Sequence, residues 1–170
     1  VTEIFAGENG HVNFYEIEET HSRTHRVNRT FVHQAANSVV QVNNMTLMNG
    51  VTCNDTNFHL AGQGAHADCN GMTISDKQQH IDNITLIDHA VPHCTSHELF
   101  KYVLDDKAVG AFTGMIYVRP DAQHTNSEQT NRSICLSKEA RMYARPQLEI
   151  YADDVRCGHG ATVGQLDEKA

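Results

Sequence analysis

Short runs of β-branched, aliphatic and aromatic residues recur along the chain, and turn-forming residues separate them. Runs of this length and composition are typical of β-strands. The separators contain glycine, asparagine or proline, as in Asn49-Gly50, Asn70-Gly71 and Pro120-Asp121. The pattern predicts strands over residues 11–17, 29–34, 38–42, 45–48, 58–61, 71–74, 81–88, 114–118, 133–136 and 147–152.

Many short strands indicate a sandwich, a barrel or a solenoid. No strict repeat is visible, and the irregular spacing of the runs weighs against a solenoid. Asparagine and threonine recur beside the strands, however, and stacked polar side chains are typical of a parallel β-helix. The pattern by itself leaves the three architectures open.

One segment carries a helical signal instead. Thr95 is followed three residues later by Glu98, which resembles a capping box, and the next apolar residues have helical spacing. Taken locally, this pattern predicts a helix of about three turns over residues 97–107.

Composition narrows the function classes. Apolar residues make up 39% of the 170 positions, tryptophan is absent and the formal net charge is −8. An acidic surface repels phosphate backbones, so we expect no nucleic-acid partner. The sequence has no apolar run of membrane-spanning length, and Val1-Thr2-Glu3 resembles no signal peptide, so we expect no membrane partner and a cytoplasmic location. Neither end looks natural, and we expect residues 1–170 to be one compact piece of a longer chain.

The five cysteines are Cys53, Cys69, Cys94, Cys135 and Cys157. They form no CxxC pair, which excludes a zinc ribbon or a thioredoxin-like motif. We expect reduced thiols, most of them buried.

Twelve histidines invite a metal hypothesis. His89, His93 and His97 are spaced by four and would share one face of a helix, but Pro92 lies inside the set and blocks that helix. His21 and His25 lie among arginines, which disfavour a bound cation. We interpret both sets as surface or ladder histidines.

Cys157 and His159 form a different pattern. On a strand, residues two apart point the same way, so these two side chains would project side by side. Thiolate and imidazole both bind iron, and a nearby imidazolium would lower the pKa of the thiol. Two ligands supply only half of a closed site. A chance pair in a glycine-rich strand end is the alternative.

Familiar catalytic patterns are absent from the sequence, including a G-x-S-x-G elbow and a phosphate-binding loop. Asp105-Asp106 and Asp153-Asp154 invite the idea of a β-helical carbohydrate-active enzyme. Adjacent residues point apart on a strand, and few aromatic residues are available to stack on sugars. We therefore interpret both pairs as solvated turn charges.

Longer motifs carry a family resemblance. The motifs are IDHAVPHCTS (87–96), LDDK (104–107), GMIYVRPDAQ (114–123), TNR (130–132), LS (136–137), PQLEIYADD (146–154), Cys157, HGATVG (159–164) and Leu166-Asp167. With these motifs, residues 65–170 closely resemble the SufD branch of the SufB/SufD family of iron–sulfur cluster assembly proteins, whereas residues 1–64 match only in strand character. Gly160 follows the candidate histidine where SufB-like sequences have an acidic residue, which favours the SufD branch.

The resemblance implies an all-β fold, a right-handed parallel β-helix core without its flanking helical regions, and it contradicts the helix at 97–107. It implies a non-catalytic scaffold that pairs with SufB and with the ATPase SufC, whose docking region would follow Ala170. A homodimer is the implied state when SufB is absent. It further implies that His159 binds iron or a nascent cluster at the SufB interface, with Cys157 as a weaker candidate. The cluster would be transient and shared with the partner, so none is expected on this piece alone. A purely structural dimerisation module remains a third interpretation.

Overall fold

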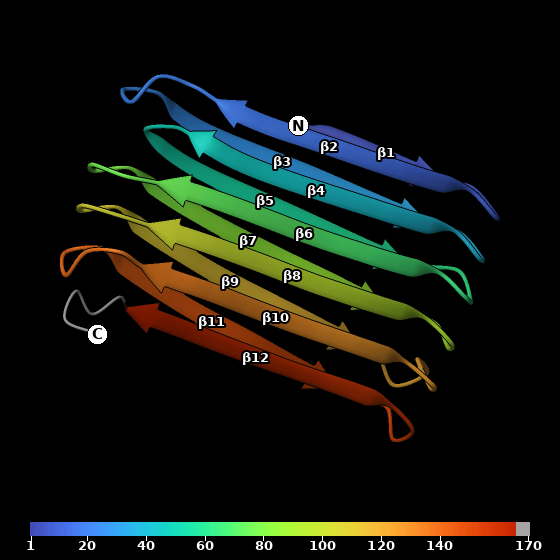
Figure 1. Cartoon of the computed structure of the whole chain (residues 1–170). Helices are drawn as coiled ribbons and strands as arrows, with labels where there is room; N and C mark the ends of the chain where they lie inside the picture. The colour runs from blue at the N-terminus through green and yellow to red at the C-terminus, as the bar shows by residue number, and fades with distance from the viewer. Residues whose placement is uncertain (166–170) are drawn as a thin grey trace.

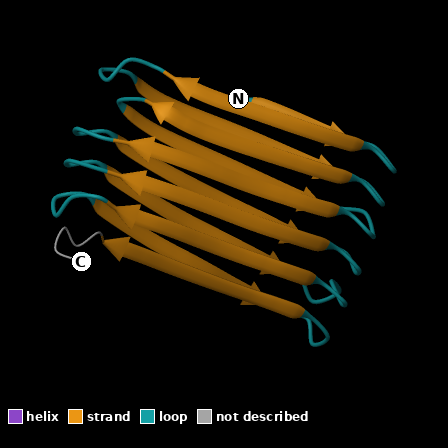
Figure 2. Cartoon of the chain, viewed as in Figure 1, coloured by secondary structure: helices purple, strands orange, loops and turns teal. Residues whose placement is uncertain are grey.

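The computed structural model describes residues 1–165, which form two six-stranded parallel sheets that face each other (Figures 1 and 2). The sheets have the orders β1-β3-β5-β7-β9-β11 and β12-β10-β8-β6-β4-β2. The chain alternates between the sheets, so every two strands complete one turn of a six-turn β-helix. Among residues 1–165 there is no helix. The predicted all-β, parallel β-helix class is confirmed.

The strands are mostly ten residues long. Their bounds are β1 Thr2–Ala6, β2 His11–Glu19, β3 His25–Gln34, β4 Val39–Met48, β5 Val51–Leu60, β6 His66–Ser75, β7 His80–His89, β8 Thr95–Leu104, β9 Val109–Val118, β10 Asn126–Cys135, β11 Arg141–Ile150 and β12 Arg156–Gln165. Residues 1–64 therefore belong to the same stack, as expected from continuity. The motif residues Leu166 and Asp167 lie outside the described residues.

The local helix prediction over residues 97–107 is wrong, because residues 95–104 form β8. Side chains in β8 alternate between buried and more exposed positions, with Phe100, Tyr102 and Leu104 on the buried face. β8 also pairs with β6 on one side and with β10 on the other, which satisfies its backbone groups. Pairing on both sides outweighs the local capping signal.

Variable turn lengths explain why the sequence shows no strict repeat. Thr2, Thr30, Thr56 and Thr85 stack directly on one another, although their spacing along the chain is 28, 26 and then 29 residues. The turns absorb these differences while the strands stay in register. The periodicity is thus a property of the stacked strands and is only approximate in the sequence.

The interior is thin and combines apolar and polar columns. In the sheet of odd-numbered strands, one column contains Val32, Phe58, Ile87 and Ile116, all of which are buried. Burying a side chain of this size contributes about 1.5–3 kcal/mol. Columns of this kind supply the hydrophobic stabilisation that a helix-free, tryptophan-free chain needs.

A neighbouring buried column is polar. Asn28, Asn54 and Asn83 stack in register, and Asn54 donates a 3.0 Å hydrogen bond to Asn83. Asn83 in turn donates to the Tyr102 hydroxyl at 2.6 Å, across the interior. Asn28 donates to Glu16 at 2.6 Å instead, so these three buried amides are tolerated through partners both within the stack and outside it. The ladders anticipated from the asparagine and threonine content are therefore present.

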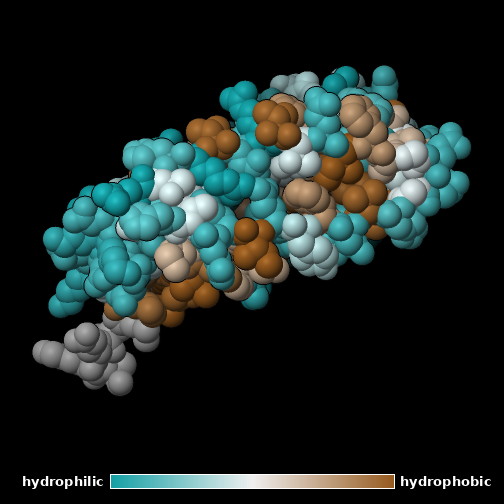
Figure 3. All heavy atoms as spheres, turned by 90° about the horizontal axis from the view of Figure 1, so that it is seen from above, coloured by the Kyte–Doolittle hydropathy of each residue, from teal (hydrophilic) through white to brown (hydrophobic). Residues whose placement is uncertain are grey.

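The first and last strands leave edges that no other described strand covers. Pro146 lies in β11, where the missing N–H is tolerated because β11 pairs only with β9 in residues 1–165. At the other end, Phe5, Tyr15 and Ile17 are exposed by 59–75%. Seen from above, this end has hydrophobic groups interrupting a mainly hydrophilic surface (Figure 3).

We predict that Gly71→Ala destabilises the fold by about 1–3 kcal/mol, because overpacking displaces core side chains. A Cβ at Gly71 would lie 2.2 Å from a ring carbon of Phe100, which stacks on it in register and packs against Phe112. Urea denaturation of the full-length protein measures the change. Gly158→Ala is the control, because a Cβ there meets nothing within 4 Å. Equal midpoints for the two variants would contradict this packing.

Candidate functional site

Cys157 and His159 lie on β12, the last described strand of its sheet. Cys157 pairs with Ser127 and His159 with Gln129, and both of these β10 residues are buried. Residues paired in a parallel sheet share a face, so Cys157 and His159 continue two interior columns. Within residues 1–165 no strand stacks below them. Cys157 is accordingly half-buried and His159 is exposed.

The first column carries serine hydroxyls in the two rungs next to Cys157, whereas the rungs before them hold Ala67 and Val40. The buried His89 ring contacts the Ser96 hydroxyl at 2.9 Å, and this hydroxyl lies 2.7 Å from that of Ser127. Ser127 is in register with Cys157. Burial lowers the pKa of His89 to about 4, so the ring is neutral at physiological pH. The column therefore leads from a neutral imidazole to the Cys157 thiol through groups that can hydrogen-bond.

The second column contains a buried carboxyl group. Gln129 donates a 2.6 Å hydrogen bond to Glu98, which is 2% exposed. Gly114 makes room for this pair, since a Cβ there would lie 2.3 Å from the Gln129 amide nitrogen. Burial raises the pKa of Glu98 to about 7, with the Gln129 hydrogen bond as a smaller opposing effect. His159 is the next residue in the same column.

The Cys157 thiol differs from the sequence expectation. Burial raises its pKa, and a hydrogen bond with the Ser127 backbone offsets only part of this effect. The thiol is therefore mostly protonated at neutral pH, and metal binding there must displace a proton. The exposed imidazole of His159 has no comparable burial, which makes it the more available ligand of the two.

Comparison with known proteins agrees with this architecture. The whole chain, residues 1–170, matches the family described as SUF system FeS cluster assembly, SufBD core domain. The iron–sulfur cluster assembly protein SufD of Escherichia coli (strain K12) is 36% identical over 115 residues, which cover 68% of this chain and 27% of that protein.

The chain belongs to the SufBD family.

Other relatives extend the likeness along nearly the full chain. SufD of Bacillus subtilis (strain 168) is 29% identical over 168 residues, covering 98% of this chain and 38% of that protein. A SufBD family protein of Synechocystis is 29% identical over 167 residues, covering 98% of this chain and 37% of that protein. The chain thus spans about a third of the length of these curated SufBD relatives. In the part of the chain that the structure describes, no helix is long and apolar enough to cross a membrane.

The structure disperses His89, His93 and His97, the set spaced by four. His89 is buried, His93 lies in a turn with a φ of 61°, and His97 is exposed on β8. The His93 ring stacks on that of His124 with 4.7 Å between the ring centroids. The proposed helical face does not exist, as Pro92 indicated.

The other sequence candidates lie at the surface or in the core. His21 and His25 are exposed, and no metal-binding group involving them is found in residues 1–165. Asp105-Asp106 and Asp153-Asp154 lie in turns outside the strands, where Asp106 accepts a hydrogen bond from the Lys77 backbone. All five cysteines are free, and Cys69, Cys94 and Cys135 are buried.

Sequence reasoning missed two features of this SufBD core. Glu98 was assigned to a helix cap, yet it lies in the interior, and the alternation of Glu98, Phe100 and Tyr102 was the available signal. His66, Asp68 and His97 gather on the outer face. The sequence does show His66 and Asp68 two residues apart, and such residues share a face if the segment is a strand. The third member, His97, could be found only from the register between β6 and β8.

We predict that the Glu98 carboxyl makes the SufBD core less stable as the pH rises. Folding raises its pKa from an ordinary 4.5 to about 7, so the folded state holds the proton more tightly than the unfolded state. Its contribution is fully present below pH 4.5, falls between pH 4.5 and 7, and is lost above that range. The integrated loss is roughly 3 kcal/mol. Denaturant unfolding of the wild type and of Glu98→Gln between pH 4 and 8 measures it.

The difference between the two proteins isolates Glu98, because His89 is common to both. The lowered pKa of His89 contributes the opposite trend, a stability that is lost as the pH falls through about 4. A stability difference between wild type and Glu98→Gln that does not change with pH would refute the buried, protonated carboxyl.

Proposed function

We propose that this chain is the β-helical core of a non-catalytic scaffold subunit, similar to SufD, in a SufB–SufC–SufD complex for iron–sulfur cluster assembly. The observation that carries the site is the position of Cys157 and His159 on β12, the last described strand, where each continues an interior column whose nearest two rungs are polar. Iron or a nascent cluster is the cargo here. His159 supplies an imidazole ligand, and Cys157 is a secondary candidate.

An incomplete ligand set fits a site shared between two chains. Cys157 and His159 offer two donors, whereas iron–sulfur clusters are usually held by four. The remaining donors would come from SufB, whose β-helix would approach the same edge. β11 and β12 offer backbone groups there, since each pairs on one side only in residues 1–165. The same edge supports a homodimer when SufB is absent.

Chemistry at this edge would follow from the state of each group. The exposed imidazole can bind a metal ion without first being desolvated, whereas the half-buried thiol must lose a proton. The Ser127 hydroxyl, in register with Cys157, and the Gln129 amide, in register with His159, lie where they can orient these ligands. Opening of the shared site would be driven from outside, by the ATPase SufC.

Five free cysteines fit a reducing compartment, and we propose the cytosol.

The β-helical carbohydrate-active enzyme is a weaker proposal. The paired aspartates lie in turns, and membership of the SufBD family provides an alternative to sugar chemistry. Turnover in a screen of acidic and neutral polysaccharides would reverse this ranking.

We predict that His159→Ala lowers cluster formation by the complete complex at least about tenfold, the scale on which loss of a metal ligand or its support acts. Cys157→Ser should have a smaller effect. The experiment reconstitutes the full-length protein with SufB and SufC and follows cluster absorbance and iron content. Size-exclusion chromatography of the same samples reports whether the complex stays intact.

His11→Ala is the matched control, because His11 is also an exposed strand histidine but lies on β2, five rungs of the sheet away from β12. Loss of clusters in His159→Ala with an intact complex supports the shared iron site. Normal clusters in that variant would refute the site and leave a structural pairing module. Loss of the complex itself would assign His159 to docking and refute its role as a ligand.

A further inference from the structure

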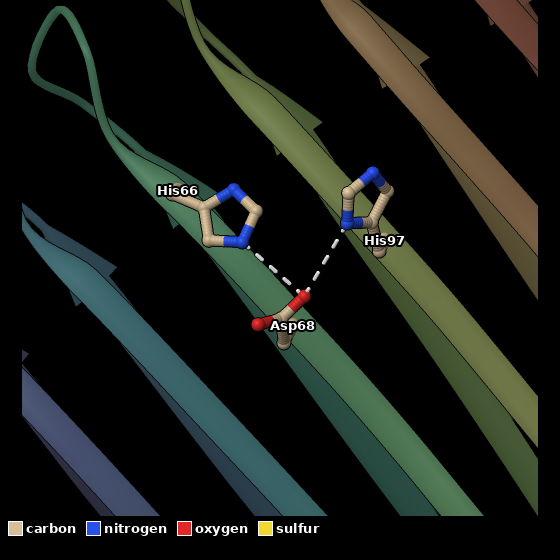
Figure 4. Close-up of side chains that lie close together, drawn as sticks. All are labelled: His66, Asp68 and His97. Atoms are coloured by element: carbon tan, nitrogen blue, oxygen red, sulfur yellow. Dashed lines mark ion pairs between the residues drawn. The ribbon is translucent and has the colours of Figure 1, made fainter.

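His66, Asp68 and His97 form a second cluster, on the outer face of the sheet of even-numbered strands. Figure 4 shows the two imidazoles on either side of the carboxylate, with His66 and Asp68 on β6 and His97 on β8. Asp68 is directly in register with His97, and His66 is two residues before Asp68 on the same face. The spacing along β6 places His66 beside Asp68, and the parallel register brings His97 to them.

The separations of the donor atoms suit a small metal ion. Asp68 Oδ1 lies 3.2 Å from His66 Nε2 and 3.6 Å from His97 Nδ1. The donor atoms of all three residues lie within 4.8 Å of one another. A tetrahedral ion with bonds of about 2.0–2.1 Å holds its ligands roughly 3.4 Å apart. Small side-chain rotations would close the set around one ion.

One of the three ligands, His66, is already oriented by a contact of its second ring nitrogen. The other ring nitrogen of His66, Nδ1, lies 2.6 Å from the Thr95 hydroxyl, which is its register partner on β8. Metal-binding histidines typically use their second nitrogen in this way, which fixes the ring and directs the free nitrogen to the ion. His66 and Asp68 are also half-buried, which limits their freedom before binding.

The surroundings favour a cation. None of the described residues that adjoin the cluster in register or along the same face is basic. Glu128, the register partner of His97 on β10, adds a further negative charge. These neighbours are Val39, Gln41, Asn70, Leu99, Asn126 and Glu128.

A second His–Asp contact in the protein differs from this cluster, because an arginine also binds its carboxylate. His59 lies 2.8 Å from Asp88, but Arg119 donates two hydrogen bonds to the same carboxylate at 2.7 and 2.9 Å. The guanidinium occupies both oxygens of Asp88 and supplies the positive charge there. Asp68 has no such arginine partner among the described residues.

We propose that His66, Asp68 and His97 bind a divalent transition-metal ion on the outer face of β6 and β8. Two imidazoles and one carboxylate are the donor set that Zn²⁺ and Fe²⁺ share, with the remaining positions open to water. The site is distinct from Cys157 and His159. Those residues continue interior columns, and β10 lies between β8 and β12.

The test is metal binding by the purified, metal-stripped full-length protein, with Zn²⁺ followed by calorimetry and Co²⁺ by its d–d absorption. We expect Asp68→Asn and His97→Ala each to lose one equivalent or to bind it at least tenfold more weakly. Thr95→Val keeps all three ligands and should weaken binding about tenfold through His66 alone. His59→Ala, the matched control, should bind as the wild type does.

The His159→Ala variant separates this proposal from the cluster-assembly site. Retention of the equivalent in His159→Ala, together with its loss in Asp68→Asn, supports the outer-face site even if His159 has no role in cluster formation. Unchanged binding in both Asp68→Asn and His97→Ala would overturn it, and the contacts of Asp68 with the two histidines would then be purely structural. Circular dichroism identifies a variant that is unfolded. Because the His97 side chain is exposed, His97→Ala is the variant that disturbs the fold least.

Discussion

The register between stacked parallel strands is the constraint on which the rest of this structure depends. A buried side chain in the middle strands has a counterpart in the rung above and in the rung below, so an amide or hydroxyl in one rung can bond to the next. Asn54 and Asn83, or Ser96 and Ser127, could not be buried singly at acceptable cost. Because the ladder supplies the partners, a chain with few large apolar residues can form an ordered interior.

The same register generates both candidate sites. Two interior columns reach the last described strand of their sheet, and there their final members, Cys157 and His159, lack a covering rung within residues 1–165. On the outer face, register places His97 beside Asp68 although the two are 29 positions apart in the chain. Functional groups in such a fold gather along columns, across rungs that are distant in the sequence.

Burial also sets the chemical state of the groups near the edge of the stack. It keeps His89 neutral, holds the Glu98 proton up to about pH 7 and disfavours the Cys157 thiolate. At this edge of the described strands an exposed imidazole, His159, therefore lies beside a half-buried thiol, Cys157.

The sequence by itself determined the strand character, the polar ladders, the family and the position of Cys157 and His159 on one face of a strand. Alternation and short motifs are local properties of the sequence. It did not determine β8, where a local capping signal at Thr95 and Glu98 predicted a helix and pairing on both sides produced a strand. It could not reveal the His66–Asp68–His97 cluster or the raised pKa of Cys157. These depend on which residues stack across turns of unequal length, and only the tertiary register decides that.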